Sequence, residues 1–434
     1  MKSVDINTNW SVTAGDERYV CDLPHDATAS PSRDYACAFG QLNGYIPASR
    51  AVFSTTLPQV RNGFCRLVIS GACGYGEVFV NDESICMLRG YAPTVFSILD
   101  MLKGAHNVLR IELLTSPEMS DKYMGLGIAG GVKLIISDEF NDIDYDSLFV
   151  KTVSTGDRTY ADAVLTVYNY NEHPVKFTLD CAVTNARGKR AGKKQSKIAL
   201  RGMQTKTLTV RVRVNNPYEW TPDDPYMYTM TAKLIATDGE ERAASTRFGI
   251  VTRALNPSRG LYINNRNVVL YGAYVAHADA ALGSVSVYVN EKRRLQALKA
   301  IGYNAVHFVE CPTAATLDAC DDVGLYAFVD LYSHLVKSKA PLGSIMSGSN
   351  VSESVYALRN HPSVTMYGVA DNVPECYGRD GGHDLISCIA QEIKILDDTR
   401  PITVSASEFA PTVKELESAG FKKLNYESDA AAIA

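Results

Sequence analysis

Seven titratable side chains between residues 277 and 375 lie at or just beyond the ends of short apolar runs that are typical of buried strands. They are His277, Asp279, His307, Glu310, Asp330, Asp371 and Glu375. Carboxylates and imidazoles are the groups that most often transfer protons in enzymes, and a carboxylate also serves as a nucleophile. Their spacing matches no metal-ligand motif, so we expect a polar pocket for acid/base chemistry or binding, without a metal or another cofactor.

The elements that must position these side chains alternate between strands and helices over residues 255–434. The predicted strands are 268–274, 305–309, 326–331, 364–370, 402–405 and 423–426. The predicted helices are 291–301, 313–323, 351–359, 385–396 and 412–419, with Gly302 and Gly324 after the first two. This alternation predicts a parallel sheet with right-handed crossovers. It favours an incomplete (β/α)8 barrel of the TIM type, with about six of eight strands and a pocket at their carboxyl ends.

Two all-β units precede this region. Residues 1–142 contain short strands with turn signals between them, such as Asn81-Asp82, a pair that tolerates the positive φ of a tight hairpin. This pattern indicates a two-sheet sandwich. In residues 143–254 the clearest strand, 206–214, alternates apolar and polar side chains, and strand spacing suits an immunoglobulin-like sandwich. The predicted fold class is therefore multidomain β plus α/β.

Composition and charge exclude several classes of partner. A hydrophobic content of 46% and a charged content of 21% are those of an ordinary globular protein. The formal net charge is −5, and the one dense basic run, 189–194, falls in an expected hairpin turn, so we expect no nucleic acid partner. No apolar stretch has the length of a membrane span or of a signal peptide. Ten cysteines without a CxxC motif favour a reducing, cytoplasmic location.

Short motifs along the whole chain resemble those of glycoside hydrolase family 2, of the β-galactosidase and β-glucuronidase type. They are LPHD at 23–26, VFVND at 78–82, GLGIAGGVKL at 125–134, WTPDDPYMY at 220–228, TRFGI at 246–250, LYGAYVAHADAALG at 270–283, LKAIGYNAVH at 298–307, NHPSV at 360–364 and DDTRP at 397–401. The resemblance implies a sugar-binding jelly-roll over 1–142, an immunoglobulin-like sandwich over 143–254 and a catalytic barrel over 255–434. It also implies a carbohydrate partner of the β-galactoside or β-glucuronide class, and it leaves a homo-oligomer open.

The resemblance further implies hydrolysis of O-glycosyl bonds with retention, by two carboxylates about 5–5.5 Å apart. The acid/base Glu of the family ends the fourth strand, and the aligned residue here is Asn372. An amide neither accepts nor delivers the proton, so the position is degenerate. The family nucleophile ends the seventh strand, and the 434 residues reach only about the sixth. We therefore expect weak or absent hydrolysis, unless Asp371 or Glu375 works together with Asp330.

Five other residues fall at family pocket positions and leave alternatives open. His277 and Asp279 match an H-x-D motif that lines the substrate pocket, or they form a hydrogen-bonded loop pair. His307 and Glu310 contact the sugar or pair with each other, and Asp330 is a vestigial pocket carboxylate. The barrel segment has no Trp, so Tyr332 or Tyr367 is expected to supply the stacking face for a sugar ring.

Three functions follow from these residues. The first is a family-2 relative with an eroded catalytic pair. The second is an active β-glycosidase with relocated carboxylates, namely Asp371 or Glu375 with Asp330. The third is a non-catalytic carbohydrate-binding or interaction protein that uses the sandwich domains.

Overall fold

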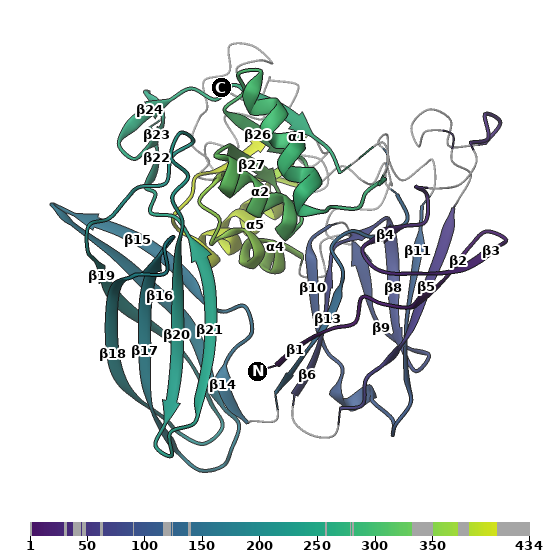
Figure 1. Ribbon diagram of the computed structural model, residues 1–434, viewed down its shortest axis with the longest axis horizontal. Helices are drawn as coiled ribbons and strands as arrows, with labels where there is room; N and C mark the ends of the chain where they lie inside the picture. The colour runs from purple at the N-terminus through teal and green to yellow at the C-terminus, as the bar shows by residue number, and fades with distance from the viewer. Residues whose placement is uncertain are drawn as a thin grey trace.

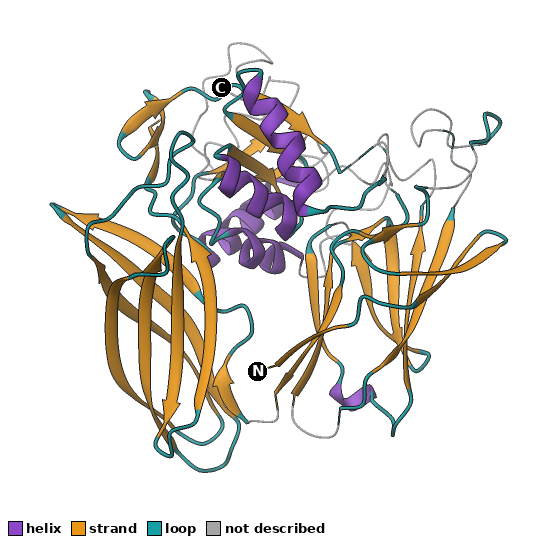
Figure 2. Ribbon diagram, viewed as in Figure 1, coloured by secondary structure: helices purple, strands orange, loops and turns teal. Residues whose placement is uncertain are grey.

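The computed structural model of the chain consists of two β-sandwiches and a third unit of alternating strands and helices that lies across both (Figure 1). It describes residues 2–29, 33–37, 45, 49–60, 64–89, 91–115, 123, 125–137, 140–256, 258–277, 279, 282–331, 350–371 and 382–405. The α-helices gather in the third unit, while the sandwiches consist of strands and one short 3-10 turn, η2 (Leu99–Met101) (Figure 2). No helix in these described ranges is both long and apolar enough to span a membrane.

The first sandwich is antiparallel throughout. Its four-stranded sheet has the order β1 (Lys2–Asp5), β13 (Val132–Ser137), β6 (Phe64–Ser70) and β10 (Pro93–Ser97). Its six-stranded sheet has the order β3 (Glu17–Cys21), β2 (Trp10–Ala14), β5 (Arg50–Leu57), β11 (Asn107–Leu114), β8 (Tyr75–Val80) and β9 (Glu83–Arg89). A small sheet of β4 (His25–Asp26), β12 (Gly127–Ile128) and β7 (Ala72–Cys73) lies beside them. Asn81 and Asp82 have φ of 51° and 64°, which confirms the predicted hairpin turn between β8 and β9.

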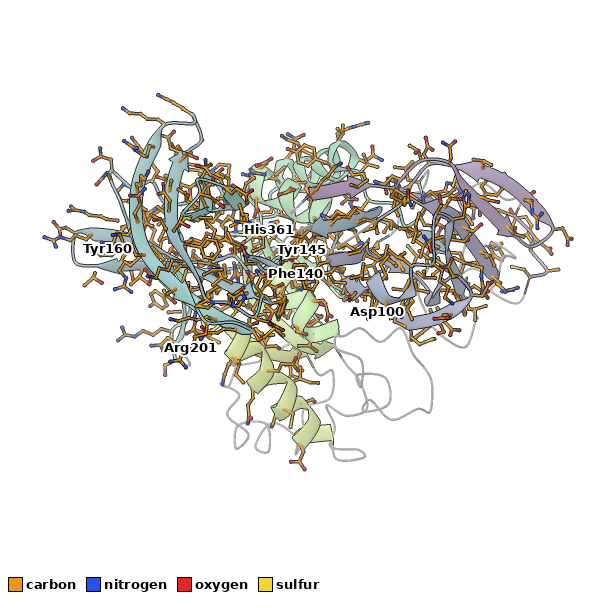
Figure 3. All side chains as sticks on the ribbon, turned by 90° about the horizontal axis from the view of Figure 1, so that it is seen from below. Asp100, Phe140, Tyr145, Tyr160, Arg201 and His361 are labelled. Atoms are coloured by element: carbon orange, nitrogen blue, oxygen red, sulfur yellow. The ribbon has the colours of Figure 1, made fainter. Side chains whose placement is uncertain are left out.

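The second sandwich pairs two antiparallel four-stranded sheets. One contains β14 (Asn141–Ile143), β16 (Arg158–Asn169), β15 (Phe149–Thr155) and β19 (Gln204–Val214). The other has the order β18 (Arg190–Leu200), β17 (Val175–Asn185), β20 (Tyr228–Ala236) and β21 (Glu241–Phe248). Along β19, Val210, Val212 and Val214 are buried and the residues between them are exposed, which confirms the predicted alternation. Figure 3 shows Tyr160 and Arg201 at the outer side of this sandwich, while His361, Tyr145 and Phe140 lie centrally, between the two sandwiches.

The third unit begins with a small antiparallel sheet and continues as a parallel one. The antiparallel strands are β22 (Arg253–Asn256), β23 (Gly260–Ile263) and β24 (Arg266–Val268). The parallel sheet follows chain order, with β25 (Gly272–Val275), β26 (Ala305–Phe308), β27 (Tyr326–Asp330), β28 (Val364–Asp371) and β29 (Ile402–Ser405). Its helices are α1 (Tyr288–Ala300), α2 (Ala314–Val323), α4 (Asn350–Leu358) and α5 (Gly382–Leu396). This is the strand–helix alternation of a TIM-type barrel, as predicted.

Local signals explain why most of these elements fall where the sequence places them. Thr313 caps α2 by accepting a hydrogen bond from the Thr316 amide, and Gly324 ends the helix in the left-handed region with φ 75°.

The predicted strand 268–274 is wrong, because its first residue pairs with β23 and its last ones with β26. The predicted helix 412–419 and strand 423–426 lie outside the described residues.

The two faces of the parallel sheet differ in what covers them. Val306, Val329 and Val369 face the helices and pack in one apolar cluster with residues of α2, α4 and α5. The opposite face carries Phe328 and Met366, which pack in a second cluster with residues of β23 and of the second sandwich. Because side chains alternate along a strand, His307 and Asp330 lie on this second face, which corresponds to the interior in a barrel that is closed.

Candidate active site

A buried pair of polar side chains, His307 and Asp330, lies on the inner face of the sheet. His307 Nε2 lies 2.6 Å from Asp330 Oδ2, and the two residues are 5% and 0% exposed. The imidazole stacks on Phe328, with ring centroids 4.2 Å apart, and Tyr274 meets its edge at 5.3 Å. An isolated carboxylate at this depth would be strongly destabilising, so the imidazole is the partner that makes its burial tolerable.

The partner of His307 differs from the one that the sequence favoured. We expected His307 either to pair with Glu310, three residues along the chain, or to contact the sugar. Its ring bonds to Asp330 on the next strand and not to Glu310, and the contact with a sugar stays a prediction. The register explains the difference, because His307 lies opposite Phe328 and Asp330 follows two residues later on the same face. Sequence proximity was a poorer guide than strand pairing.

Gly368 on β28 allows the Asp330 carboxylate to lie directly against that strand. Asp330 and Gly368 are register partners, and the Leu331 amide donates to the Gly368 carbonyl at 2.8 Å. A Cβ on residue 368 would collide with Asp330 Oδ1. The carboxylate is therefore held beside the strand whose last residue is Asp371, which pairs with Ser405. Asn372 and Glu375 lie outside the described residues, so their expected roles stay predictions.

A second group of side chains joins the first sandwich to the loop after β25. Tyr91, between β9 and β10, stacks on His277 with ring centroids 3.9 Å apart and 19° between the planes. Burial and the charge of Arg294 lower the pKa of His277 to about 3, so its imidazole is neutral at ordinary pH. The ring also bonds the backbone of Cys311, while its buried Nε2 has no hydrogen-bond partner within the described part of the chain.

Glu310 belongs to this second group. Burial raises the pKa of Tyr91 well above its ordinary value, and the charge of the nearby Glu310 carboxylate raises it further. The Tyr91 hydroxyl therefore stays protonated. Sequence reasoning missed Tyr91 altogether, because the contact joins two domains and leaves no local pattern. Glu310, which is 8% exposed, thus lies near the sandwich–barrel junction.

Asp279 has a local structural role that the sequence left open. Its Oδ1 accepts a hydrogen bond from the Leu282 amide at 3.0 Å. Its backbone exchanges two further bonds with Gly283, at 2.7 and 3.0 Å. Asp279 therefore closes the tight turn that leads from the His277 loop to Ser284.

Asp26, on β4 of the first sandwich, anchors the same loop. Its Oδ2 accepts hydrogen bonds from the Ser284 amide at 2.8 Å, the Ser284 hydroxyl at 2.6 Å and the Tyr123 hydroxyl at 2.9 Å. Its Oδ1 accepts from the Leu126 amide and from both donors of Thr28. Burial alone would raise the pKa of Asp26, but these hydrogen bonds outweigh burial and lower it. The buried carboxylate therefore joins the first sandwich to the loop that carries His277.

Tyr367, one of the two tyrosines expected to stack on a sugar, faces the other way. Its ring is fully buried among the helix-facing residues of β28, and its hydroxyl donates to Asp397 at 2.8 Å. The expectation is wrong for Tyr367, because side chains alternate along β28 and residue 367 falls on the outer side, which faces the helices. Tyr332 lies outside the described residues.

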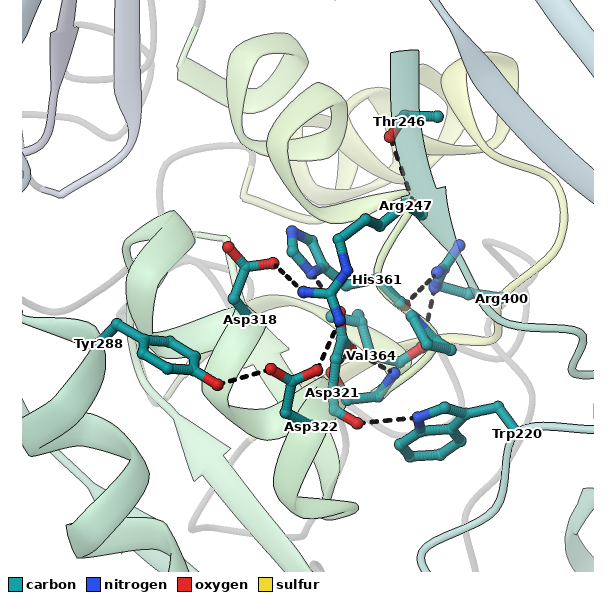
Figure 4. A network of polar contacts seen from close by, with 12 residues as sticks. Trp220, Thr246, Arg247, Tyr288, Asp318, Asp321, Asp322, His361, Val364 and Arg400 are labelled. Atoms are coloured by element: carbon teal, nitrogen blue, oxygen red, sulfur yellow. Dashed lines mark hydrogen bonds and ion pairs between the residues drawn. The ribbon is translucent and has the colours of Figure 1, made fainter. Parts of the chain in front are cut away.

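A cluster of two carboxylates and an imidazole lies at the opposite, amino-terminal end of the strands (Figure 4). One ligand atom each from Asp318, Asp321 and His361 lie within 4.8 Å of one another. No sequence spacing predicted this group, because it joins α2 to the turn before β28. His361 Nδ1 lies 2.6 Å from Asp321 Oδ2, and Asp321 Oδ1 accepts two hydrogen bonds from Ser363.

Protein cations already balance the charge of this cluster. Arg247, at the end of β21, lies 3.4 Å from Asp318 and 2.5 Å from Asp322. Burial would lower the pKa of His361, but the Asp321 carboxylate outweighs it and raises that pKa. Trp220 donates from its indole to the Asp321 carbonyl at 3.0 Å (Figure 4). The network therefore fastens the second sandwich to the barrel.

Comparisons with known proteins give one consistent family. The family profile described as Glycosyl hydrolases family 2 matches residues 143–250, and the profile described as Glycosyl hydrolases family 2, TIM barrel domain, matches residues 257–431. The chain is 23% identical to a β-galactosidase of Bacteroides ovatus over 460 aligned residues, covering 93% of this chain and 54% of the relative. It is 25% identical to a putative β-glucuronidase of Formosa agariphila over 405 aligned residues, covering 89% of this chain and 37% of the relative.

Solved structures show the same fold. A glycosyl hydrolase family 2 member from Bacteroides cellulosilyticus superposes with a TM-score of 0.89 at 19% identity, covering 96% of this chain and 58% of that one. A β-glucuronidase of Bacteroides uniformis superposes with a TM-score of 0.76 at 16% identity, covering 93% and 52%. The chain spans about half the length of most of these relatives.

Proposed function

Because the chain belongs to glycoside hydrolase family 2, we propose that it binds a β-galactoside or β-glucuronide at the carboxyl ends of β25–β28 and hydrolyses it slowly or not at all. The family and the multidomain fold predicted from the sequence are confirmed. The observation that carries the proposal is the buried His307–Asp330 pair, held against the strand that leads into Asn372.

The His307–Asp330 pair suits binding of a sugar. It places an imidazole, held by a buried carboxylate, on the inner face of the sheet, where the imidazole can exchange hydrogen bonds with ring hydroxyls. Tyr274 supplies an aromatic ring beside the imidazole and is 49% exposed. An aromatic face next to polar anchors is a common arrangement in carbohydrate sites.

The reaction needs more than binding. Retaining hydrolysis requires a carboxylic acid to protonate the leaving oxygen and a carboxylate to attack the anomeric carbon. At the family's acid/base position Asn372 offers an amide, which can neither donate a proton to the leaving oxygen nor take one up afterwards. General acid/base catalysis contributes roughly 10²–10⁴-fold to rates, so we expect a loss of that size.

Hydrolysis of 4-nitrophenyl β-galactoside and β-glucuronide by the full chain tests the proposal, with calorimetric binding of the parent sugars measured in parallel. We expect sugar binding that His307→Ala weakens, together with turnover far below the ordinary range of about 1–10³ s⁻¹. Turnover within that range would overturn the proposal of eroded catalysis. Absence of sugar binding would overturn the binding part.

A second candidate is an active glycosidase in which Asp330 works with Asp371 or Glu375. The close approach of the Asp330 carboxylate to Gly368 favours it, because that carboxylate lies beside the strand that ends at Asp371. This candidate predicts that Asp330→Asn abolishes turnover, and that either Glu375→Gln or Asp371→Asn does so as well, while circular dichroism stays unchanged. Turnover that survives Asp330→Asn, or that survives both Glu375→Gln and Asp371→Asn, would exclude it.

A further inference from the structure

A cavity of about 240 Å³ lies between the second sandwich and the barrel, far from the candidate active site in the topology. Its walls come from β15, from the connection between β21 and β22, and from the turns that precede β28 and β29. It therefore opens at the amino-terminal ends of the parallel strands, whereas the catalytic pockets of such barrels form at the carboxyl ends. Neither the family profiles nor the proposed function accounts for it.

The lining of this cavity is strongly cationic. It contains Lys151, Arg253, Arg359 and Arg400, against Asp398 as the single carboxylate among the described lining residues. Lys151 and Asp398 form an ion pair of 2.6 Å at the rim, where the side chains are 30% and 66% exposed. Arg400 is neutralised from behind by a buried carboxylate, at 2.5 Å.

Of the four cations in this lining, Arg253 and Arg359 are the two for which no ion pair is formed within the described part of the chain. Arg253 donates to the Pro362 carbonyl at 2.6 Å, and Arg359 donates to two backbone carbonyls at 3.1 and 3.0 Å. The Arg359 guanidinium also lies over the rings of Phe149 and Tyr356. Carbonyls and ring faces carry partial charges only, so neither guanidinium group is paired directly with a carboxylate, although the charge of Asp146 acts on Arg359 and that of Asp397 acts on Arg253.

Each of these arginines also keeps a buried N–H without an acceptor. The Nε atoms of Arg253 and Arg359 are inaccessible to solvent and have no hydrogen-bond partner among the residues that the structure describes. Arg359 as a whole is only 7% exposed. Burial lowers the pKa of both arginines, and the charge of Arg400 lowers that of Arg253 further. An unsatisfied buried donor is destabilising, and more so when it is charged.

We propose that this cavity binds a phosphate-class oxyanion, either inorganic phosphate or the phosphate of a small monoester. A tetrahedral oxyanion presents several acceptors at once, and the planar guanidinium fork matches them in pairs. Its charge compensates Arg253 and Arg359, and Lys151 lies at the rim to attract it. Asp398 opposes binding, because its carboxylate shares the rim. Bound there, the anion ties the second sandwich to the turns before β28 and β29.

Titration calorimetry of the full chain with inorganic phosphate, at constant ionic strength set by chloride, tests the proposal. We expect saturable binding that Lys151→Met weakens about five- to tenfold and Asp398→Asn strengthens by a similar factor, as expected for one charge at a rim. A purely structural role of the rim pair would not produce opposite changes in affinity. Phenyl phosphate in place of phosphate separates the two sources, since a monoester site binds it more tightly and a free-anion site does not.

Lys233→Met is the matched control, because Lys233 forms an exposed ion pair of 2.8 Å with Glu241 elsewhere on the second sandwich. It removes the same charge and should leave the affinity for phosphate unchanged. Arg253→Lys and Arg359→Lys keep the charge but remove the fork, and each should weaken binding while circular dichroism shows a folded chain. Absence of saturable binding, or equal weakening by Lys233→Met and Lys151→Met, would overturn the proposal.

Discussion

Replacing Asp26 by Asn should loosen the junction between the first sandwich and the loop that carries His277. Each carboxylate oxygen of Asp26 faces three donors, and each set includes at least one backbone N–H. An amide supplies a single acceptor, so its NH2 group must face the Ser284 amide or the amides of Thr28 and Leu126. Hydroxyl groups can rotate to accept a bond, but a backbone N–H cannot.

The cost of Asp26→Asn follows from this geometry. At least one buried backbone N–H loses its acceptor, which costs about 1–3 kcal/mol, and the remaining bonds lose the assistance of the charge. We therefore expect a decrease of about 2–4 kcal/mol in the free energy of unfolding at pH 7. The pKa of Asp26 lies below its unfolded value of about 3.9. Its contribution is therefore present above about pH 4 and is lost as the pH falls through the folded pKa.

Urea unfolding followed by the fluorescence of Trp10 and Trp220 measures this effect, and hydrogen exchange at residues 282–286 locates it. The control is Glu83→Gln, which breaks an ion pair between side chains that are 55% and 61% exposed and should cost less than about 1 kcal/mol. The reasoning fails if Asp26→Asn costs no more than the control. An unchanged rate of hydrogen exchange at Ser284 would also contradict it. So would an equal loss of stability by the unaltered chain and Asp26→Asn between pH 5 and pH 3.

Three further predictions concern single groups. The imidazole of His277, with a pKa of about 3, should show no protonation step between pH 5 and pH 8 in its NMR signals, and a titration in that range would contradict its burial. Gly368→Ala should destabilise the chain by about 1–3 kcal/mol in urea unfolding, because its Cβ would displace the Asp330 carboxylate, and a neutral effect would contradict the close approach. The raised pKa of His361 means that its pair with Asp321 stabilises the fold fully below about pH 6.5 and loses that effect as the pH rises through the folded pKa. His361→Asn should therefore cost more stability at pH 6 than at pH 9, and an equal cost at both would contradict the pairing.

The sequence predicted those parts of the fold that rest on local signals. The alternation of β19 and the end of α2 at Gly324 each depend on a few neighbouring residues, and the structure places both as expected. The apolar run from Val268 to Tyr274 gave a wrong prediction of one continuous strand, because its residues are divided between two sheets. That division depends on which strands pair in the tertiary structure.

The candidate site was predicted less completely, since its contacts join distant segments. His307 and Asp330 were both singled out, but their pairing depends on the register between β26 and β27. The stacking of Tyr91 on His277 crosses from one domain to another and has no signature in either segment. Residue types therefore indicated candidate side chains, and strand register and domain docking decided which of them meet.

Turnover of 4-nitrophenyl β-galactoside and β-glucuronide by the unaltered chain, measured beside binding of the same sugars, tests the central claim most directly. The account predicts measurable sugar binding with turnover below about 0.1 s⁻¹, roughly 10²-fold or more under a typical enzyme. Turnover of about 10 s⁻¹ that Asp330→Asn or Glu375→Gln abolishes would contradict it, because a working pair of carboxylates would then exist despite Asn372.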